Sequence, residues 1–162
     1  MAVWTANLLG WPILQISIAR FTLSLPLESF AGDRPFYSIR SWERSGRLYN
    51  IFAIKRWKTL LPDGGPWFGG FSKKKVAGRD PAYLQTFILE TRRAEFAHWC
   101  MLCSFPVFFL WNPLWACLVM VAYAVVANLP FIIVQRYNRL VLTRICARIS
   151  ERQNIYTPVA AP

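Results

Sequence analysis

One stretch constrains the fold of this chain more than any other. Residues 113–134 run for 22 positions without a charged side chain, and Asn128 is the one strongly polar residue among them. A helix needs about 20 such residues to cross the hydrocarbon core of a bilayer. The run therefore predicts a membrane-spanning helix, and we expect a mainly α-helical integral membrane protein.

Two other segments are nearly as apolar. Residues 2–25 carry no charge before Arg20, so they lack the basic start of a signal peptide and predict a retained transmembrane helix. Residues 96–111 are apolar around His98 and lead into a turn at Asn112. With the long run they predict a membrane hairpin over 96–134. Because 16 residues are short for a span, the depth of the first arm stays open.

The remaining segments are basic. Residues 26–95 hold 13 Lys and Arg, and residues 136–153 predict an amphipathic helix with arginines on one face. The tail, 154–162, is expected to be disordered. The positive-inside rule places both basic segments in the cytoplasm and the N-terminus outside. We therefore expect one domain, 1–162, as a multi-pass protein of the cell membrane.

Composition excludes two other classes of function. The net charge of +11 is compatible with nucleic-acid binding, but the basic residues flank apolar segments, which favours a membrane surface. Cys100 and Cys103 share a helix face without a second ligand pair, so we expect no metal. We expect no cofactor either.

The densest group of ionisable side chains lies between Glu90 and Trp99. Thr91, Glu95 and His98 would share one face of a helix. A carboxylate beside an imidazole holds one tautomer and raises its basicity, which suits a general base acting on a hydroxyl. The alternative is that the pair only stabilises helix packing. A di-iron site needs a second Glu-x-x-His pair, and the chain has a single histidine.

Two further groups predict binding functions. Pro130 predicts a kink in the long helix, and polar side chains before and after it would lie near Glu95 and His98. They would hold a sugar, a phosphate or an oxyanion, or else anchor the helix at the interface; they are Asn128, Gln135, Arg136, Asn138 and Arg139. An earlier group combines cations, an aromatic ring and a tight turn, in which Asp63 is either a second carboxylate or the cap of the turn; it comprises Arg56, Trp57, Lys58 and Asp63.

The chain resembles the glycosyl-4,4'-diaponeurosporenoate acyltransferases, which carry out the last step of staphyloxanthin synthesis. The resemblance covers roughly residues 41–145. It rests on Glu43, Gly46 and Asn50 before Arg56-Trp57-Lys58 and Pro62-Asp63-Gly64, on Ile88–Glu95 with His98-Trp99, and on Ala127–Pro130 with Ile133–Arg139. It implies transfer of a fatty acyl group to a sugar hydroxyl of a glycosylated carotenoid, or of a similar glycolipid, at the membrane.

The resemblance therefore implies a membrane O-acyltransferase whose partners are membrane lipid, an acyl donor on an unknown carrier and the glycosylated acceptor. Glu95 would orient His98 as base, and Asn138, Gln135 or Arg136 would stabilise the oxyanion. The other substrate contacts expected are Asn128, Arg139, Glu90, Trp57 and Asp63, with an anionic donor held by Lys55, Arg56, Lys58 and Lys73–Lys75. The alternative is a non-catalytic accessory subunit of a larger membrane complex that binds carotenoid or lipid, because abundant Trp and Phe suit such packing.

Overall fold

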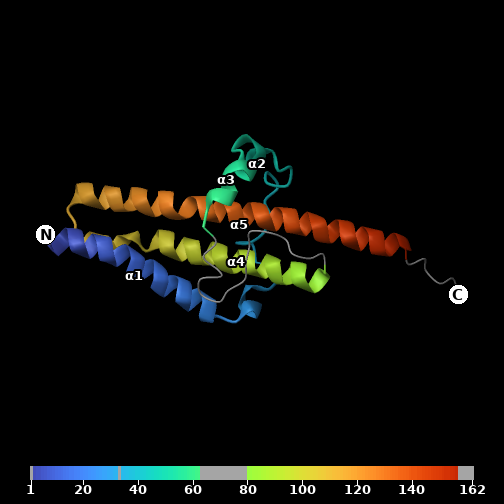
Figure 1. Ribbon diagram of the computed structural model, residues 1–162, viewed down its shortest axis with the longest axis horizontal. Helices are drawn as coiled ribbons and strands as arrows, with labels where there is room; N and C mark the ends of the chain where they lie inside the picture. Colours follow the sequence, from blue (N-terminus) through green and yellow to red (C-terminus); the bar gives the residue numbers. More distant parts are fainter. Residues whose placement is uncertain (1, 33, 63–79, 157–162) are drawn as a thin grey trace.

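The computed structural model describes residues 2–32, 34–62 and 80–156, and in this part of the chain every regular element is helical. The three long helices are α1 (Ala2–Ser24), α4 (Pro81–Cys103) and α5 (Leu114–Tyr156). Figure 1 shows α4 packed along α5, with α1 against α4, and the N-terminus beside the turn between α4 and α5. Short elements complete the fold: η1 (Leu27–Phe30), α2 (Arg47–Ile51), α3 (Ile54–Trp57), η2 (Lys58–Leu60) and η4 (Phe105–Leu110).

The expected helical hairpin is present as α4, η4 and α5. Asp80 caps α4 because its carboxylate accepts a hydrogen bond of 3.0 Å from the Tyr83 amide, and Pro81 follows at the first helical position. The segment 96–111 is not one helix, since α4 ends at Cys103 and the rest winds as the 3-10 turn η4. Asn112 closes the turn by donating a hydrogen bond of 2.8 Å to the Phe108 carbonyl.

The α5 helix differs from the prediction of a separate amphipathic helix over 136–153. It runs without a break for 43 residues, through Pro130, and includes residues 154–156 that were expected to be disordered. The apolar face of its second half does not lie free. Leu142 is buried against α4 in a cluster with Leu84, Phe87 and Ile88. Because this apolar face packs against α4, the second half of α5 does not need to bend away and lie flat on a membrane to bury it.

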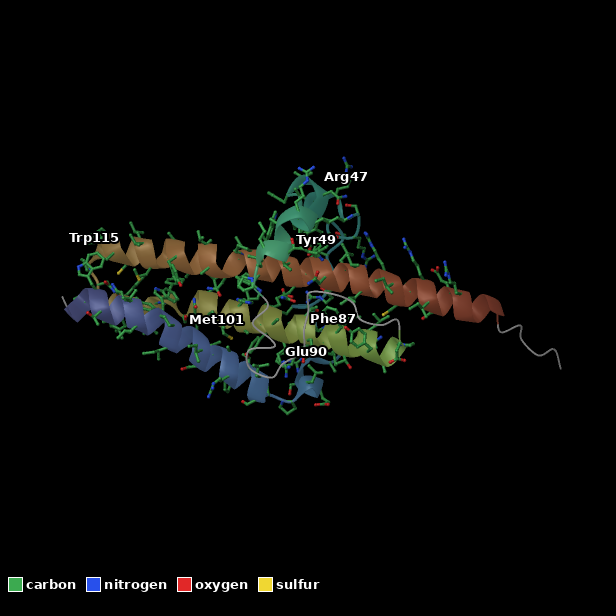
Figure 2. The ribbon with its side chains drawn as sticks, viewed as in Figure 1. Arg47, Tyr49, Phe87, Glu90, Met101 and Trp115 are labelled. Carbon is green, nitrogen blue, oxygen red and sulfur yellow. The ribbon has the colours of Figure 1, made fainter. Side chains whose placement is uncertain are left out.

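One end of the molecule exposes many large apolar side chains. At the end that holds the N-terminus and Trp115 (Figure 2), a small core of Trp11, Phe108 and Ala124 joins α1, η4 and α5. Around this core many large apolar side chains are exposed, including Trp4, Leu8, Ile13, Leu110, Leu114, Trp115, Leu118 and Val126. Among the described residues, α5 contains the one segment, Leu114–Arg152, that is long and apolar enough to cross a membrane.

Candidate functional site

A buried network of two carboxylates and two guanidiniums lies where α5 changes from apolar to basic. Arg136 on α5 bridges Glu43, at 2.6 Å, and Glu95 on α4, at 2.9 Å. The second oxygen of Glu95 accepts from Arg139 at 2.5 Å. The Glu43, Glu95 and Arg139 side chains are at most 2% exposed. The charges balance, as buried ionic groups require.

Arg136 organises the segment before α2. Its five N–H groups are all used, because it also donates to the carbonyls of Phe36 and Ser38 at 3.4 and 3.1 Å. This segment therefore closes over the junction of α4 and α5 although about 100 residues of chain separate them from it. A guanidinium with no free donor positions other groups and has nothing left to offer a substrate.

Glu43 is the most heavily hydrogen-bonded carboxylate of the network. Besides Arg136, it accepts from the Tyr49 hydroxyl at 2.6 Å and from the Arg40 amide at 2.8 Å. Burial pushes the pKa of Glu43 upward, but the hydrogen bonds from Arg136 and Tyr49 outweigh it and hold the pKa at about 2. Burial, followed by the Glu43 carboxylate, raises the pKa of Tyr49. Both groups therefore keep a fixed protonation state near neutral pH.

The expected pairing of Glu95 with His98 is wrong. Glu95 is held by the two arginines, while Nδ1 of His98 lies 3.0 Å from Oδ1 of Asn128 on α5. The His98 ring also stacks on Phe131, with 4.6 Å between ring centroids. The spacing of Glu95 and His98 permits contact, but full positive charges on the facing helix attract a buried carboxylate more strongly than a neighbouring imidazole does.

The contact with Asn128 determines the histidine tautomer. Nδ2 of Asn128 donates to the Ala124 carbonyl at 3.0 Å, which turns Oδ1 towards His98. An amide oxygen only accepts, so Nδ1 of His98 must carry the proton. In the neutral ring Nε2 then has the lone pair. Asn128 thus performs the orienting task that the sequence had indicated for Glu95.

Unused polar atoms lie further along the same face of α5. Gln135 and Arg139 follow Asn128 at helical spacing, and both are buried. Among the described residues, Oε1 of Gln135 and both Nε and Nη1 of Arg139 have no hydrogen-bond partner. A buried acceptor one helical turn from buried donors is suited to a hydroxyl group, which both donates and accepts.

The structure places the remaining predicted residues less centrally. Lys58 donates to Oδ1 of Asn138 at 3.2 Å and lies 4.9 Å from the centre of the Tyr137 ring. Burial, and then Lys55 nearby, lowers the pKa of Lys58. Arg56 is exposed, Trp57 donates to the Phe52 carbonyl, and Glu90 pairs with Arg93. Asp63 and Lys73–Lys75 lie outside the described residues.

Sequence reasoning missed Glu43 and Tyr49 as members of the site. Glu43 belongs to the residues that carry the family resemblance, and that was the available signal. Nothing local shows that this carboxylate is buried, because its partner Arg136 is 93 positions away. Among the described residues, no group of three or more His, Cys, Asp and Glu side chains could hold a metal ion.

The fold and site define a class: a small helical protein with one helix able to cross a membrane, in which a buried ionic network adjoins a histidine of fixed tautomer. Residues 33–148 match the family model described as glycosyl-4,4'-diaponeurosporenoate acyltransferase. The chain belongs to this family. No solved structure matches it significantly.

Curated relatives agree with the family model. A protein of Staphylococcus haemolyticus named glycosyl-4,4'-diaponeurosporenoate acyltransferase is 33% identical over 147 residues, which cover 86% of this chain and 85% of the relative. Proteins of the same name from Staphylococcus aureus strains RF122 and USA300 are each 30% identical over 149 residues, covering 89% of this chain and 90% of the relative. The similarity therefore extends over nearly the whole of each chain.

Proposed function

We propose that this protein is a membrane O-acyltransferase that moves a fatty acyl group to a sugar hydroxyl of a glycosylated carotenoid. The names of its relatives describe acyl transfer to a glycosyl diaponeurosporenoate. The observation that carries the mechanism is the contact between His98 and Asn128, which leaves Nε2 as the basic nitrogen of a neutral imidazole.

The reaction needs a base and a proton donor in turn. Nε2 of His98 takes the proton from the acceptor hydroxyl while its oxygen attacks the acyl carbonyl. The new ester bond forms as the bond to the carrier breaks, and the imidazolium returns the proton to the leaving group. A positioned base of this kind contributes roughly 10²–10⁴-fold to the rate.

Arg139 and Gln135 are the groups best placed to bind the acceptor and the developing oxyanion. The free N–H groups of Arg139 offer donors to an oxyanion, and the amide oxygen of Gln135 offers an acceptor to a sugar hydroxyl. Asn138, held by Lys58, is a further donor on α5. Arg136 has no free N–H group, so its role is to position Glu95 and the segment around Glu43.

The membrane is proposed to surround the apolar end. The 22 residues of α5 from Leu114 to Gln135 rise about 33 Å, close to the thickness of the hydrocarbon core. Arg136 and Glu95 then sit at the boundary with water, where a lipid-soluble acceptor presents its sugar. With α1 as a second span, the N-terminus lies outside and the basic segments lie in the cytoplasm.

A non-catalytic accessory subunit is the second candidate. The exposed apolar side chains of α1 and α5 favour it, because a pigment or a partner helix would cover them as well as lipid does. In that case His98 only joins α4 to α5, and its removal would leave the chemistry of the complex unchanged.

The test replaces His98 by Ala in cells that make the glycosylated carotenoid but lack this chain. Mass spectrometry measures the acylated product after complementation. We expect a loss of at least about 100-fold with normal protein levels in the membrane. Cys103→Ala, an exposed change on the same helix, is the matched control and should restore the product fully. Full product with His98→Ala would refute the mechanism and favour the accessory subunit.

A further inference from the structure

The second half of α5 and the segment before α2 together form a strongly basic surface. We call it the basic ridge and define it by five exposed arginines: Arg44, Arg47, Arg144, Arg148 and Arg152. On α5 the three arginines recur every fourth residue, so they share one face. Within 40–57 and 136–152 the one exposed carboxylate is Glu151, since Glu43 is buried in the ionic network.

The two parts of the ridge are fastened to each other. The Arg144 guanidinium donates to the Arg44 carbonyl and packs against Gly46, where an added Cβ would lie 3.5 Å from its nitrogens. Gly46 has a φ of 73°, a left-handed conformation that glycine adopts without strain. Arg47 follows at once and points outward from α2 in Figure 2. The ridge is therefore a built surface and not a set of unrelated loop charges.

The continuity of α5 lifts the ridge away from the membrane. If Arg136 marks the boundary of the hydrocarbon core, Arg144 and Arg148 lie about 12 and 18 Å beyond it along the helix. The headgroup layer is only about 5–8 Å thick on each side. A helix lying flat would press these arginines onto lipid, but a continuous α5 presents them to water.

We propose that the basic ridge is the docking surface for the acyl donor, and that this donor is an acidic carrier protein with the acyl group on a flexible arm. The inference rests on the proposed acyl transfer, for which it names the donor class. Exposed cations spread along a helix complement an acidic protein surface and steer its association. Arg144 lies about 24 Å along α5 from Asn128, so the acyl group must reach His98 on an extended arm.

The proposed donor is also consistent with the chemistry of the transfer. An acyl thioester on the arm loses its carbon–sulfur bond as the sugar oxygen forms the ester. The hydroxyl proton passes through His98 to the sulfur, which leaves as a thiol. No oxidant, reductant or further reactant is needed, and the discharged carrier dissociates from the ridge.

The experiment measures binding separately from catalysis. The full chain is placed in nanodiscs of zwitterionic lipid, and the probe is a purified acidic acyl carrier protein bearing a palmitoyl thioester. We expect binding that weakens steeply with added salt. Arg148, whose side chain is exposed, is changed to Glu, and the affinity should fall about tenfold. Arg148→Lys keeps the charge and should bind nearly as wild type.

Arg34→Glu is the matched control, because Arg34 is also exposed but lies outside the ridge. It should leave carrier binding unchanged. Equal affinity of wild type and Arg148→Glu would overturn the proposal. So would an Arg148→Glu defect confined to binding of anionic vesicles, or efficient use of palmitoyl coenzyme A by a wild-type protein that does not bind the carrier.

These outcomes separate the ridge from the reaction. His98→Ala should bind the carrier as wild type does, since His98 is remote from the ridge. Binding at the ridge without any acyl transfer by the wild-type protein would refute the proposed function and leave the docking surface. Transfer that does not depend on Arg148 would support the proposed function and refute the docking surface.

Discussion

The apolar end of the molecule and its polar end, by which we mean the part of the fold from the ionic network of Arg136 to the C-terminal end of α5, are held together by different kinds of polar contact. At the apolar end, Asn7 on α1 joins Asn112 and Trp111 through neutral hydrogen bonds of 2.8 Å. At the polar end, Glu95 and Arg136 take part in full ion pairs that are shielded from water. Neutral bonds suit a region whose outer surface is apolar, because an unmatched charge there costs far more than an unmatched amide.

The comparison teaches where this protein is vulnerable. Breaking a neutral bond leaves one amide unsatisfied, whereas removing one member of the ionic network leaves an uncompensated buried charge. The polar end should therefore respond to single substitutions much more than the apolar end, and the following changes measure the difference.

Glu95→Ala should have the largest effect on stability. It deprives Arg139 of the one ion pair it makes among the described residues, and Arg136 of its bond to α4. We expect a loss of about 3–5 kcal/mol in the free energy of unfolding, measured by reversible denaturation in mixed micelles. Glu95→Gln keeps the acceptor oxygen and should lose less. Equal stability of Glu95→Ala and wild type would show that the network does not hold α4 to α5.

Glu43→Gln tests the network through its pH dependence. A folded-state pKa of about 2 lies below the ordinary value of 4.5, so ionised Glu43 stabilises the fold above pH 4.5. This contribution is lost as pH falls through 4.5 towards 2. At pH 7 we expect the variant to be about 2 kcal/mol less stable than wild type. The difference should shrink below pH 4.5, and a constant difference down to pH 2 would contradict the prediction.

Gly46→Ala tests the left-handed backbone conformation at the start of α2. The positive φ of 73° strains any residue with a Cβ, at a cost of about 1–2 kcal/mol in unfolding free energy. Asn tolerates this conformation better, so Gly46→Asn is the control and should lose less. Thermal unfolding followed by circular dichroism ranks the variants. No difference between Ala and Asn would mean that φ relaxes on substitution.

Asn7→Leu should have the smallest effect on the free energy of unfolding, and it tests the hydrogen bonds at the apolar end. In the proposed arrangement Asn7 lies within the membrane, where hydrogen bonds between helices contribute about 0.6 kcal/mol on average. We expect a loss of this size, and a double-mutant cycle with Asn112→Leu isolates the shared contact. A coupling as large as that of the ionic network would remove the contrast between the two ends.

The helices were largely predictable because their causes are local. The uncharged run from 2 to 25 gave α1 within one residue of its end at Ser24, and Asn112 was correctly expected at the hairpin turn. The continuity of α5 was not predictable. It depends on burial of Leu142 against α4, a contact between residues 54 or more positions apart in the chain.

The sequence predicted which residues of α4 and α5 lie close together, but not which side chain binds which. The hairpin correctly predicted that Glu95 and His98 meet the polar residues of α5. Which side chain binds which depends on facing charges, so Glu95 went to the arginines and His98 to Asn128. Helical spacing does not predict which of several facing partners a side chain binds. It also says nothing about Glu43, which belongs to a separate segment of the chain.

Because α5 is unbroken, it fixes the direction in which the arginines of its second half point relative to Asn128 at the histidine site. One residue inserted after Arg139 would turn Arg144, Arg148 and Arg152 by about 100° relative to Asn128 and shift them by about 1.5 Å along the helix. The ridge would then face away from Gly46 although every side chain were still present. Seven inserted residues, close to two full turns, would restore the direction but move these arginines about 10.5 Å further along the helix, away from Arg44 and Gly46. Chain length between the two regions is therefore constrained in units of helical turns.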